Sequence, residues 1–264
     1  MKNILVPVGT MENGVNNLRY AINFATISGA KVYVINLYKE FSKVAGLTKV
    51  NELMMQESEE ILSNLLSQVD TQGVDVVAKS IKGDPFEGIQ RISKQLDIDL
   101  IILSPQSIEI DTQVYLGNVT GKIVKQMDIP VLIVPKGYLF RKFESILLAF
   151  KRGYFEKENV LAPLRDMAAM FSSKINSLHV HTPDVADDTT PIDPELKAIQ
   201  HSYTETKNAT IFQGVLEHFQ SHNPDMLCVL RRKRGFFKKL WEKNTVSKKE
   251  FHTSIPLLIL RGQE

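Results

Sequence analysis

Short apolar runs alternate along the chain with longer segments in which apolar residues recur every three or four positions. The short runs are rich in β-branched residues, which predicts strands at residues 4–8, 32–37, 74–81, 100–103 and 131–134. The segments between them have the spacing of amphipathic helices, predicted at residues 15–28, 51–69, 85–96 and 117–127. Alternating strands and helices predict a parallel sheet with right-handed crossovers.

The same pattern restarts after residue 142, and this internal repeat is the most informative feature of the sequence. Strands are predicted at 145–150, 174–180, 203–206, 226–230 and 257–260, and helices at 158–172, 194–200 and 209–220. Each last strand follows an Ile-Pro step. Proline is compatible with a strand at this place, since it is tolerated at the first strand position. We therefore predict an α/β fold of two tandem, doubly wound, Rossmann-like domains with five parallel strands each. Their limits are residues 1–137 and 143–264, with a short linker at 136–142.

Composition narrows the class of protein. The chain has 264 residues, of which 43% are hydrophobic and 23% charged, as in an ordinary globular protein of one or two domains. Its single cysteine, Cys228, excludes a disulfide framework and a cysteine-cluster zinc site within the chain. No apolar run reaches the ~20 residues of a membrane helix, and the first residues lack the apolar core of a signal peptide. We expect a soluble, cytoplasmic protein without a membrane partner.

The net charge of +2 conceals a strong asymmetry. Residues 231–249 contain nine basic residues and one acidic residue, which leaves 23 basic and 29 acidic residues elsewhere. One interpretation is a solvated basic loop whose aromatic residues, Phe236, Phe237 and Trp241, pack on the protein. The other is an anion site in which Arg and Lys bind phosphate. Basic and aromatic residues also alternate in single-stranded nucleic-acid binders, but no nucleic-acid module accompanies them, so nucleic acid is not the expected partner.

The remaining polar residues do not form a recognisable catalytic or metal-binding pattern. His179 and His181 face the same side of a predicted strand, but the other four histidines lie on scattered elements without ligand spacing. There is no Gly-x-Ser-x-Gly elbow, no phosphate-binding Gly-Lys-Ser/Thr loop and no oriented Cys–His pair. We therefore predict no metal site and no catalytic residues, and expect that the chain is not an enzyme.

Four landmarks, found in order, resemble those of the universal stress protein family in its tandem two-domain form. They are the opening strand at 4–8, the triplet Gly83-Asp84-Pro85, the strand at 100–103 with its loop and helix, and the proline-led last strand. The second repeat adds Ser177-Leu178-His179-Val180, which is similar to the family's second strand. The resemblance covers nearly the whole chain. It implies an adenine nucleotide alpha hydrolase-like fold and a stress-response role in binding or signalling.

The resemblance also implies how the two repeats associate. Family members pair their last strands antiparallel between two domains, which buries an apolar sheet edge that would otherwise be a liability. We expect the two repeats to do this within one chain, as a pseudo-twofold pair. A further homodimer is a plausible partner arrangement, and the protein partner is not indicated by the sequence.

The family's nucleotide pattern follows the fourth strand: Gly, two residues, Gly, nine residues, Gly, then Ser or Thr. Its glycines let the backbone approach phosphates, and the next helix offers free N–H groups. In the first repeat only the third glycine remains, since the matching residues are Ser104, Ser107, Gly117 and Asn118. Gly9 stands where ATP-binding members usually carry an aspartate for the ribose. The other nucleotide contacts of the family map to Pro7, Leu37, Leu103 and Val119.

The second repeat departs further from the pattern, which maps to Arg231, Arg234, Asn244 and Thr245 without any glycine. Lys151 stands at the aspartate position. If this segment binds an anion, the candidate ligands are its basic and helix-capping residues: Arg231, Arg232, Lys233, Arg234, Lys238, Asn244 and Thr245.

Three functional hypotheses follow. The first is a non-catalytic stress-response protein with degenerate nucleotide loops. The second is a nucleotide sensor that binds ATP or AMP through the first domain. The third is a phosphate or polyanion binder that uses residues 231–239 and whose affinity would fall steeply with salt. No firm cofactor is predicted, and ATP and AMP are the candidate ligands.

Overall fold

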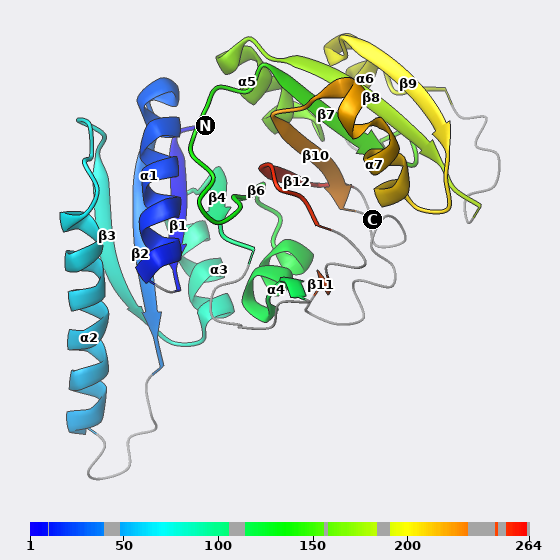
Figure 1. Ribbon diagram of the computed structural model, residues 1–264. Helices are drawn as coiled ribbons and strands as arrows, with labels where there is room; N and C mark the ends of the chain where they lie inside the picture. Colours follow the sequence, from blue (N-terminus) through cyan, green and yellow to red (C-terminus); the bar gives the residue numbers. More distant parts are fainter. Residues whose placement is uncertain are drawn as a thin grey trace.

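The computed structural model (Figure 1) describes residues 1–9, 11–39, 48–105, 114–155, 158–183, 191–231, 246–247 and 252–262. The first half of the chain contains β1 (Asn3–Val8), α1 (Met11–Ser28), β2 (Lys31–Tyr38), α2 (Thr48–Ser67), β3 (Val76–Lys82), α3 (Pro85–Gln95), β4 (Leu100–Leu103), β5 (Val114–Leu116), α4 (Asn118–Gln126) and β6 (Val131–Ile133). The second half contains β7 (Ser145–Phe150), α5 (Ala162–Phe171), β8 (Lys174–His181), α6 (Pro194–Ile199), β9 (Ser202–Lys207), α7 (Ile211–His222), β10 (Met226–Arg231), β11 (Val246–Ser247) and β12 (Leu257–Arg261).

Ten of the strands form one sheet in the order β3-β2-β1-β4-β6-β12-β10-β7-β8-β9. Each half supplies five adjacent strands, and all pairs within a half are parallel. From either outer edge towards the centre, the strands follow the same order: the third, second, first, fourth and last strand of the repeat. The predicted doubly wound α/β fold is thereby confirmed, whereas the domain limits 1–137 and 143–264 stay a prediction.

The two halves meet at the centre of the sheet, where β6 pairs antiparallel with β12 (Figure 1). Leu132 lies opposite Leu258, and both side chains are completely buried. The expected pairing of the last strands within one chain is therefore confirmed. It removes two apolar edges that would otherwise expose unpaired backbone groups.

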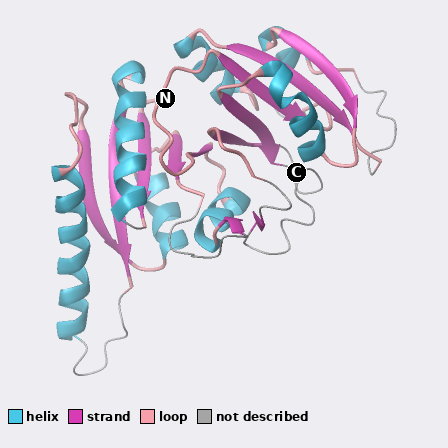
Figure 2. Ribbon diagram, viewed as in Figure 1, coloured by secondary structure: helices cyan, strands magenta, loops and turns pink. Residues whose placement is uncertain are grey.

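Helices cover both faces of the sheet (Figure 2), which explains why its central strands are apolar on both sides. On one face, side chains of α1, α2, α5 and α6 pack against the sheet in a single hydrophobic cluster. On the other face, α3, α4 and α7 pack in a second cluster. Within the described parts of the chain, no helix combines the length and the apolar character needed to cross a bilayer.

An aspartate at the same place in each repeat fixes the start of the first strand of that half. Asp99 Oδ2 accepts hydrogen bonds from the backbone N–H groups of Lys2 and Asn3, at 2.6 and 3.0 Å. In the second half, Asp225 Oδ2 accepts from the N–H groups of Glu144 and Ser145, at 2.8 and 3.0 Å. The sequence repeat is thus repeated in local hydrogen bonding.

A glycine in the third helix of each half permits close contact with the second strand of that half. A Cβ atom built on Gly88 of α3 would lie 2.3 Å from Leu37 Cδ2. A Cβ atom on Gly214 of α7 would lie 2.8 Å from Val180 Cγ2. A larger residue at either position would force the strand side chain or the helix to shift, so the two glycines allow both helices to lie close to the sheet.

The structure differs from the sequence prediction at several elements. Helix α5 begins at Ala162 rather than at residue 158, because Asn159 has a left-handed backbone (φ 60°) and Pro163 suits a first helical turn. The short strands β5 and β11 were not predicted, and they pair antiparallel across the two halves. Strands of two or three residues carry no periodic signal, so only the tertiary structure reveals them.

The connection between β6 and β7, which contains the predicted linker, packs between the two halves through two phenylalanines. Phe140 and Phe143, which stand between β6 and β7, pack against Phe24 of α1 and Phe171 of α5. The rings of Phe24 and Phe171 also contact each other edge to face, with centroids 5.3 Å apart. The connection therefore also packs, because these rings bury apolar surface that two separate domains would expose, and the linker limits 136–142 stay a prediction.

Replacing Phe143 with alanine should lower the free energy of unfolding by about 3–5 kcal/mol, because the side chain is completely buried among aromatic rings. Urea denaturation measures this loss. The matched control is Leu139→Ala, since Leu139 lies in the same connection but is 71% exposed. Its effect should stay within about 0.5 kcal/mol. Equal losses for the two variants would contradict the packing described.

Candidate functional site

The predicted nucleotide residues of the first half lie at the carboxyl edge of its sheet. From β1 the chain proceeds to β2 and β3 on one side, whereas β4 leads to β6 on the other side. This reversal between β1 and β4 is the switch point at which open α/β sheets place their ligands. Pro7 and Gly9 at the end of β1 thus come to the same edge as Leu103 and Ser104 at the end of β4.

Ser104 replaces the first glycine of the pattern, and its hydrogen-bonding groups are engaged within the protein. Its buried hydroxyl donates to Asn17 Oδ1 on α1, at 3.0 Å. Its carbonyl accepts from the hydroxyl of Thr120 on α4, at 3.2 Å. Ser104 therefore ties α1, the end of β4 and α4 together, at the position predicted for the first glycine of the nucleotide pattern.

Leu37, at the end of β2, is held against α3 by its contact with Gly88. The neighbouring Asn36 donates from Nδ2 to the carbonyl of Val8, at 3.1 Å, and accepts at Oδ1 from Ser58 of α2, at 2.7 Å. These contacts fix the ends of β1 and β2 relative to each other.

The beginning of α4 supplies the remaining predicted residues. Gly117 is the N-cap residue, with an extended backbone (φ −67°) and no side-chain cap, and its N–H donates to the carbonyl of Pro105 at 2.9 Å. Asn118 is exposed and Val119 is half-buried. A helix N-terminus favours anions through its dipole and its unbonded N–H groups. Ser107 falls outside the described residues, so its place relative to this helix stays a prediction.

Arg231, at the end of β10, contacts the first half of the chain. Its Nη1 donates to the carbonyl of Val124 in the last turn of α4, at 2.9 Å, where a cation complements the helix dipole. Its Nη2 lies 3.6 Å from Asp128 Oδ1, and its side chain is only 13% exposed. The other predicted anion ligands, Arg232, Lys233, Arg234, Lys238, Asn244 and Thr245, lie outside the described residues. Their role stays a prediction.

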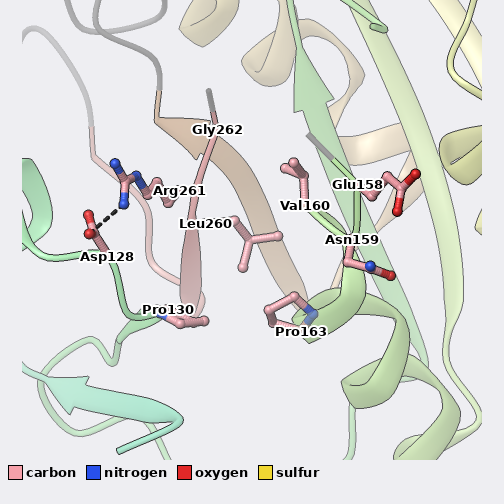
Figure 3. A pocket seen from close by; sticks show the side chains of 9 residues that line it. All are labelled: Asp128, Pro130, Glu158, Asn159, Val160, Pro163, Leu260, Arg261 and Gly262. Atoms are coloured by element: carbon pink, nitrogen blue, oxygen red, sulfur yellow. Dashed lines mark ion pairs between the residues drawn. The ribbon is translucent and has the colours of Figure 1, made fainter. Parts of the chain in front are cut away.

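A pocket of about 240 Å³ lies beside this contact, between the end of β12, the segment before β6 and the start of α5 (Figure 3). Its lining residues are Asp128, Pro130, Glu158, Asn159, Val160, Pro163, Leu260, Arg261 and Gly262. Figure 3 shows Arg261 directed at Asp128, with which it forms an ion pair. The pocket is smaller than the roughly 300–1,000 Å³ of typical ligand sites. The sequence did not indicate it, because residues of both repeats form it.

A second polar cluster lies on β8 and β9, where the sequence predicted none. His181 Nε2 is 3.4 Å from Glu205 Oε2. The hydroxyl of Tyr203 lies 2.7 Å from Glu205 Oε1 and 2.8 Å from His179 Nδ1. The hydrogen bond from Tyr203 lowers the pKa of Glu205, with burial acting in the opposite direction. The sequence analysis missed this cluster because His179 and Glu205 lie on different strands, and the register that places them opposite each other cannot be read from either strand alone.

Comparison with known proteins gives the family. The sequence model described as the universal stress protein family matches residues 1–135, which is more than half of the chain. The chain belongs to the universal stress protein family. The universal stress protein MJ0531 of Methanocaldococcus jannaschii is 26% identical over 141 residues, which cover 51% of this chain and 82% of that protein.

A solved universal stress protein structure shows the same fold over nearly the whole chain. A universal stress protein from Archaeoglobus fulgidus DSM 4304 superposes with a TM-score of 0.71 at 16% identity, covering 98% of this chain and 96% of that one. This similarity extends over both halves and therefore supports the tandem arrangement of the fold. A further universal stress protein, solved in complex with cAMP, covers 52% of this chain and 98% of its own, at 18% identity with a TM-score of 0.42.

Replacing Ser104 with alanine should lower the free energy of unfolding by about 1–3 kcal/mol, because the buried Asn17 amide oxygen loses its hydrogen-bond donor. Urea denaturation measures this loss. The same replacement at Ser254, which is exposed, provides the control and should change stability little. A neutral Ser104→Ala variant would contradict a structural role for this hydroxyl.

Cys228 should be unreactive in the native protein, because the side chain is completely buried on β10. Burial raises the pKa of the Cys228 thiol, so the thiol stays protonated at pH 8, whereas an unfolded cysteine has a pKa near ~8.5 and reacts as thiolate. A chromogenic disulfide reagent should therefore label the chain only after denaturant is added. Rapid labelling of the native protein at pH 8 would contradict this expectation.

Proposed function

We propose that this universal stress protein is a non-catalytic, cytoplasmic stress-response protein that acts by binding a partner, without holding ATP as nucleotide-binding relatives do. The hydrogen bond between Ser104 and Asn17 carries the proposal. Ser104, with this hydrogen bond, occupies the position where the first glycine of the nucleotide pattern would let a phosphate approach. Gly9 adds to this, since it offers no carboxylate for a ribose.

A nucleotide sensor is the second candidate, and the start of α4 favours it. Gly117 keeps the last glycine of the pattern at the switch point, and as the N-cap residue it has no side chain with which to cap the helix. An AMP or ATP phosphate would be favoured at this end by the helix dipole. The two candidates differ in whether the purified protein carries or binds adenine nucleotide.

The test has two parts. The full chain is purified without added nucleotide and denatured, and the supernatant is analysed for adenine nucleotide by absorbance and chromatography. The melting temperature is then measured with and without Mg-ATP. We expect no released nucleotide and no change in melting temperature. A ligand at about 100 times its Kd would add about 2.7 kcal/mol, or roughly 5–10 °C for a chain of this size. Either signal would overturn the proposal in favour of the sensor.

A gain-of-binding variant tests the structural explanation. The triple replacement Gly9→Asp, Ser104→Gly and Ser107→Gly restores the carboxylate and both glycines, and it should produce a melting shift with Mg-ATP. The control is the triple replacement of the same residues by alanine, which restores neither feature and should give no shift. Equal behaviour of the two variants would show that these positions do not decide nucleotide binding.

A further inference from the structure

Two histidines and a glutamate of the second half converge on one face of the sheet, away from the predicted nucleotide edge of the first half. His179 and His181 are two residues apart on β8, so their side chains leave the strand on the same side. Glu205 on β9 lies directly opposite His179 in the parallel register and shares that side. One ligand atom from each of the three residues lies within 4.8 Å of the other two.

The hydrogen bonds of His179 determine which of its nitrogens faces the cluster. Its Nε2 is 2.8 Å from the carbonyl of Lys151, which only accepts, so Nε2 carries a hydrogen. The ring is buried and stacks on Phe150, with centroids 5.1 Å apart, which fixes its orientation. Nδ1 is left to face Tyr203 and Glu205. A metal-binding histidine in proteins typically donates its second N–H to a carbonyl in this way.

Glu205 and His181 already have the separation of two ligands of one metal ion. Two ligand atoms at ~2.0–2.1 Å from a tetrahedral zinc ion are about 3.3 Å apart, and His181 Nε2 lies 3.4 Å from Glu205 Oε2. Tyr203 holds the other carboxylate oxygen through its hydroxyl, at 2.7 Å. The carboxylate is thus oriented before any ion arrives, which lowers the ordering cost of binding.

Burial decreases across the cluster. His179 is buried, the side chain of His181 is 35% exposed and that of Glu205 is 56% exposed. An ion can therefore enter from solvent and keep a coordination position for water or another ligand, as in zinc sites with three protein ligands. Two imidazoles and one carboxylate suit zinc and neighbouring transition metals, whereas magnesium and calcium prefer oxygen ligands alone.

We propose that His179, His181 and Glu205 form a binding site for a divalent transition-metal ion, with zinc as the best match. His179 binds through Nδ1 and His181 through Nε2. The ion replaces the hydrogen that joins Nδ1 to the Tyr203 oxygen, and that proton is released to solvent, while Tyr203 keeps its own hydroxyl hydrogen on Glu205. The site lies on the second half, so its test is independent of ATP binding by the first.

The experiment uses the tag-free full chain after removal of metals with a chelator, and isothermal titration with zinc chloride. One zinc ion should bind per chain. His181→Ala and Glu205→Gln should each weaken zinc binding at least about tenfold. Loss of a metal ligand should lower the affinity at least as much as loss of a residue that only hydrogen-bonds to a ligand. Both residues are partly exposed, and an unchanged melting temperature in metal-free buffer will establish that the variants fold. Magnesium chloride should give no comparable heat.

A second histidine pair in the chain provides the control. His218 and His222 are one turn apart on α7, with ring centroids separated by 6.0 Å, and such a pair can also chelate metal ions. The double replacement His218→Ala and His222→Ala should leave the zinc affinity unchanged. The proposal fails if wild type binds no zinc, if this control abolishes binding, or if both His181→Ala and Glu205→Gln bind as wild type does.

Discussion

The antiparallel pairing of β6 with β12 joins the two sheets of this chain into one. Each strand ends a parallel half-sheet. β6 is apolar throughout and β12 is apolar up to Arg261, so neither half could leave that edge in water. Pairing satisfies the backbone groups of both strands and buries Leu132 against Leu258. The aromatic contact of Phe140 and Phe143 with α1 and α5, the pair β5–β11 and the bonds of Arg231 to α4 all lie around this junction.

The direction of that pairing also decides where the two repeats meet chemically. Because β6 and β12 run in opposite directions, the start of β6 lies beside the end of β12. Asp128, just before β6, therefore faces Arg231 and Arg261 at the carboxyl ends of β10 and β12. The carboxyl edge of the second half is thus bordered by residues of the first half.

The two halves share the devices that build the fold but not the residues at their carboxyl edges. Asp99 and Asp225 fix the first strands in the same way, and Gly88 and Gly214 allow the same close helix contact. At the edges, however, Ser104 is tied to Asn17, whereas Arg231 is tied to α4. The contacts that build the backbone are shared by both halves, while the side chains at the carboxyl edges differ.

The sequence alone determined the strand and helix pattern, its repetition and the Ile-Pro entry to both last strands, because these depend on local periodicity. It also indicated the family and the departures from its nucleotide pattern. It could not show that Phe140 and Phe143 pack between the halves, or that Arg231 reaches Asp128, since these contacts join segments with no local relation. Nor could it bring Glu205 to His179 and His181, because the register between β8 and β9 is set by packing across the whole sheet. Only the tertiary structure decided which side chains from different strands and helices come into contact.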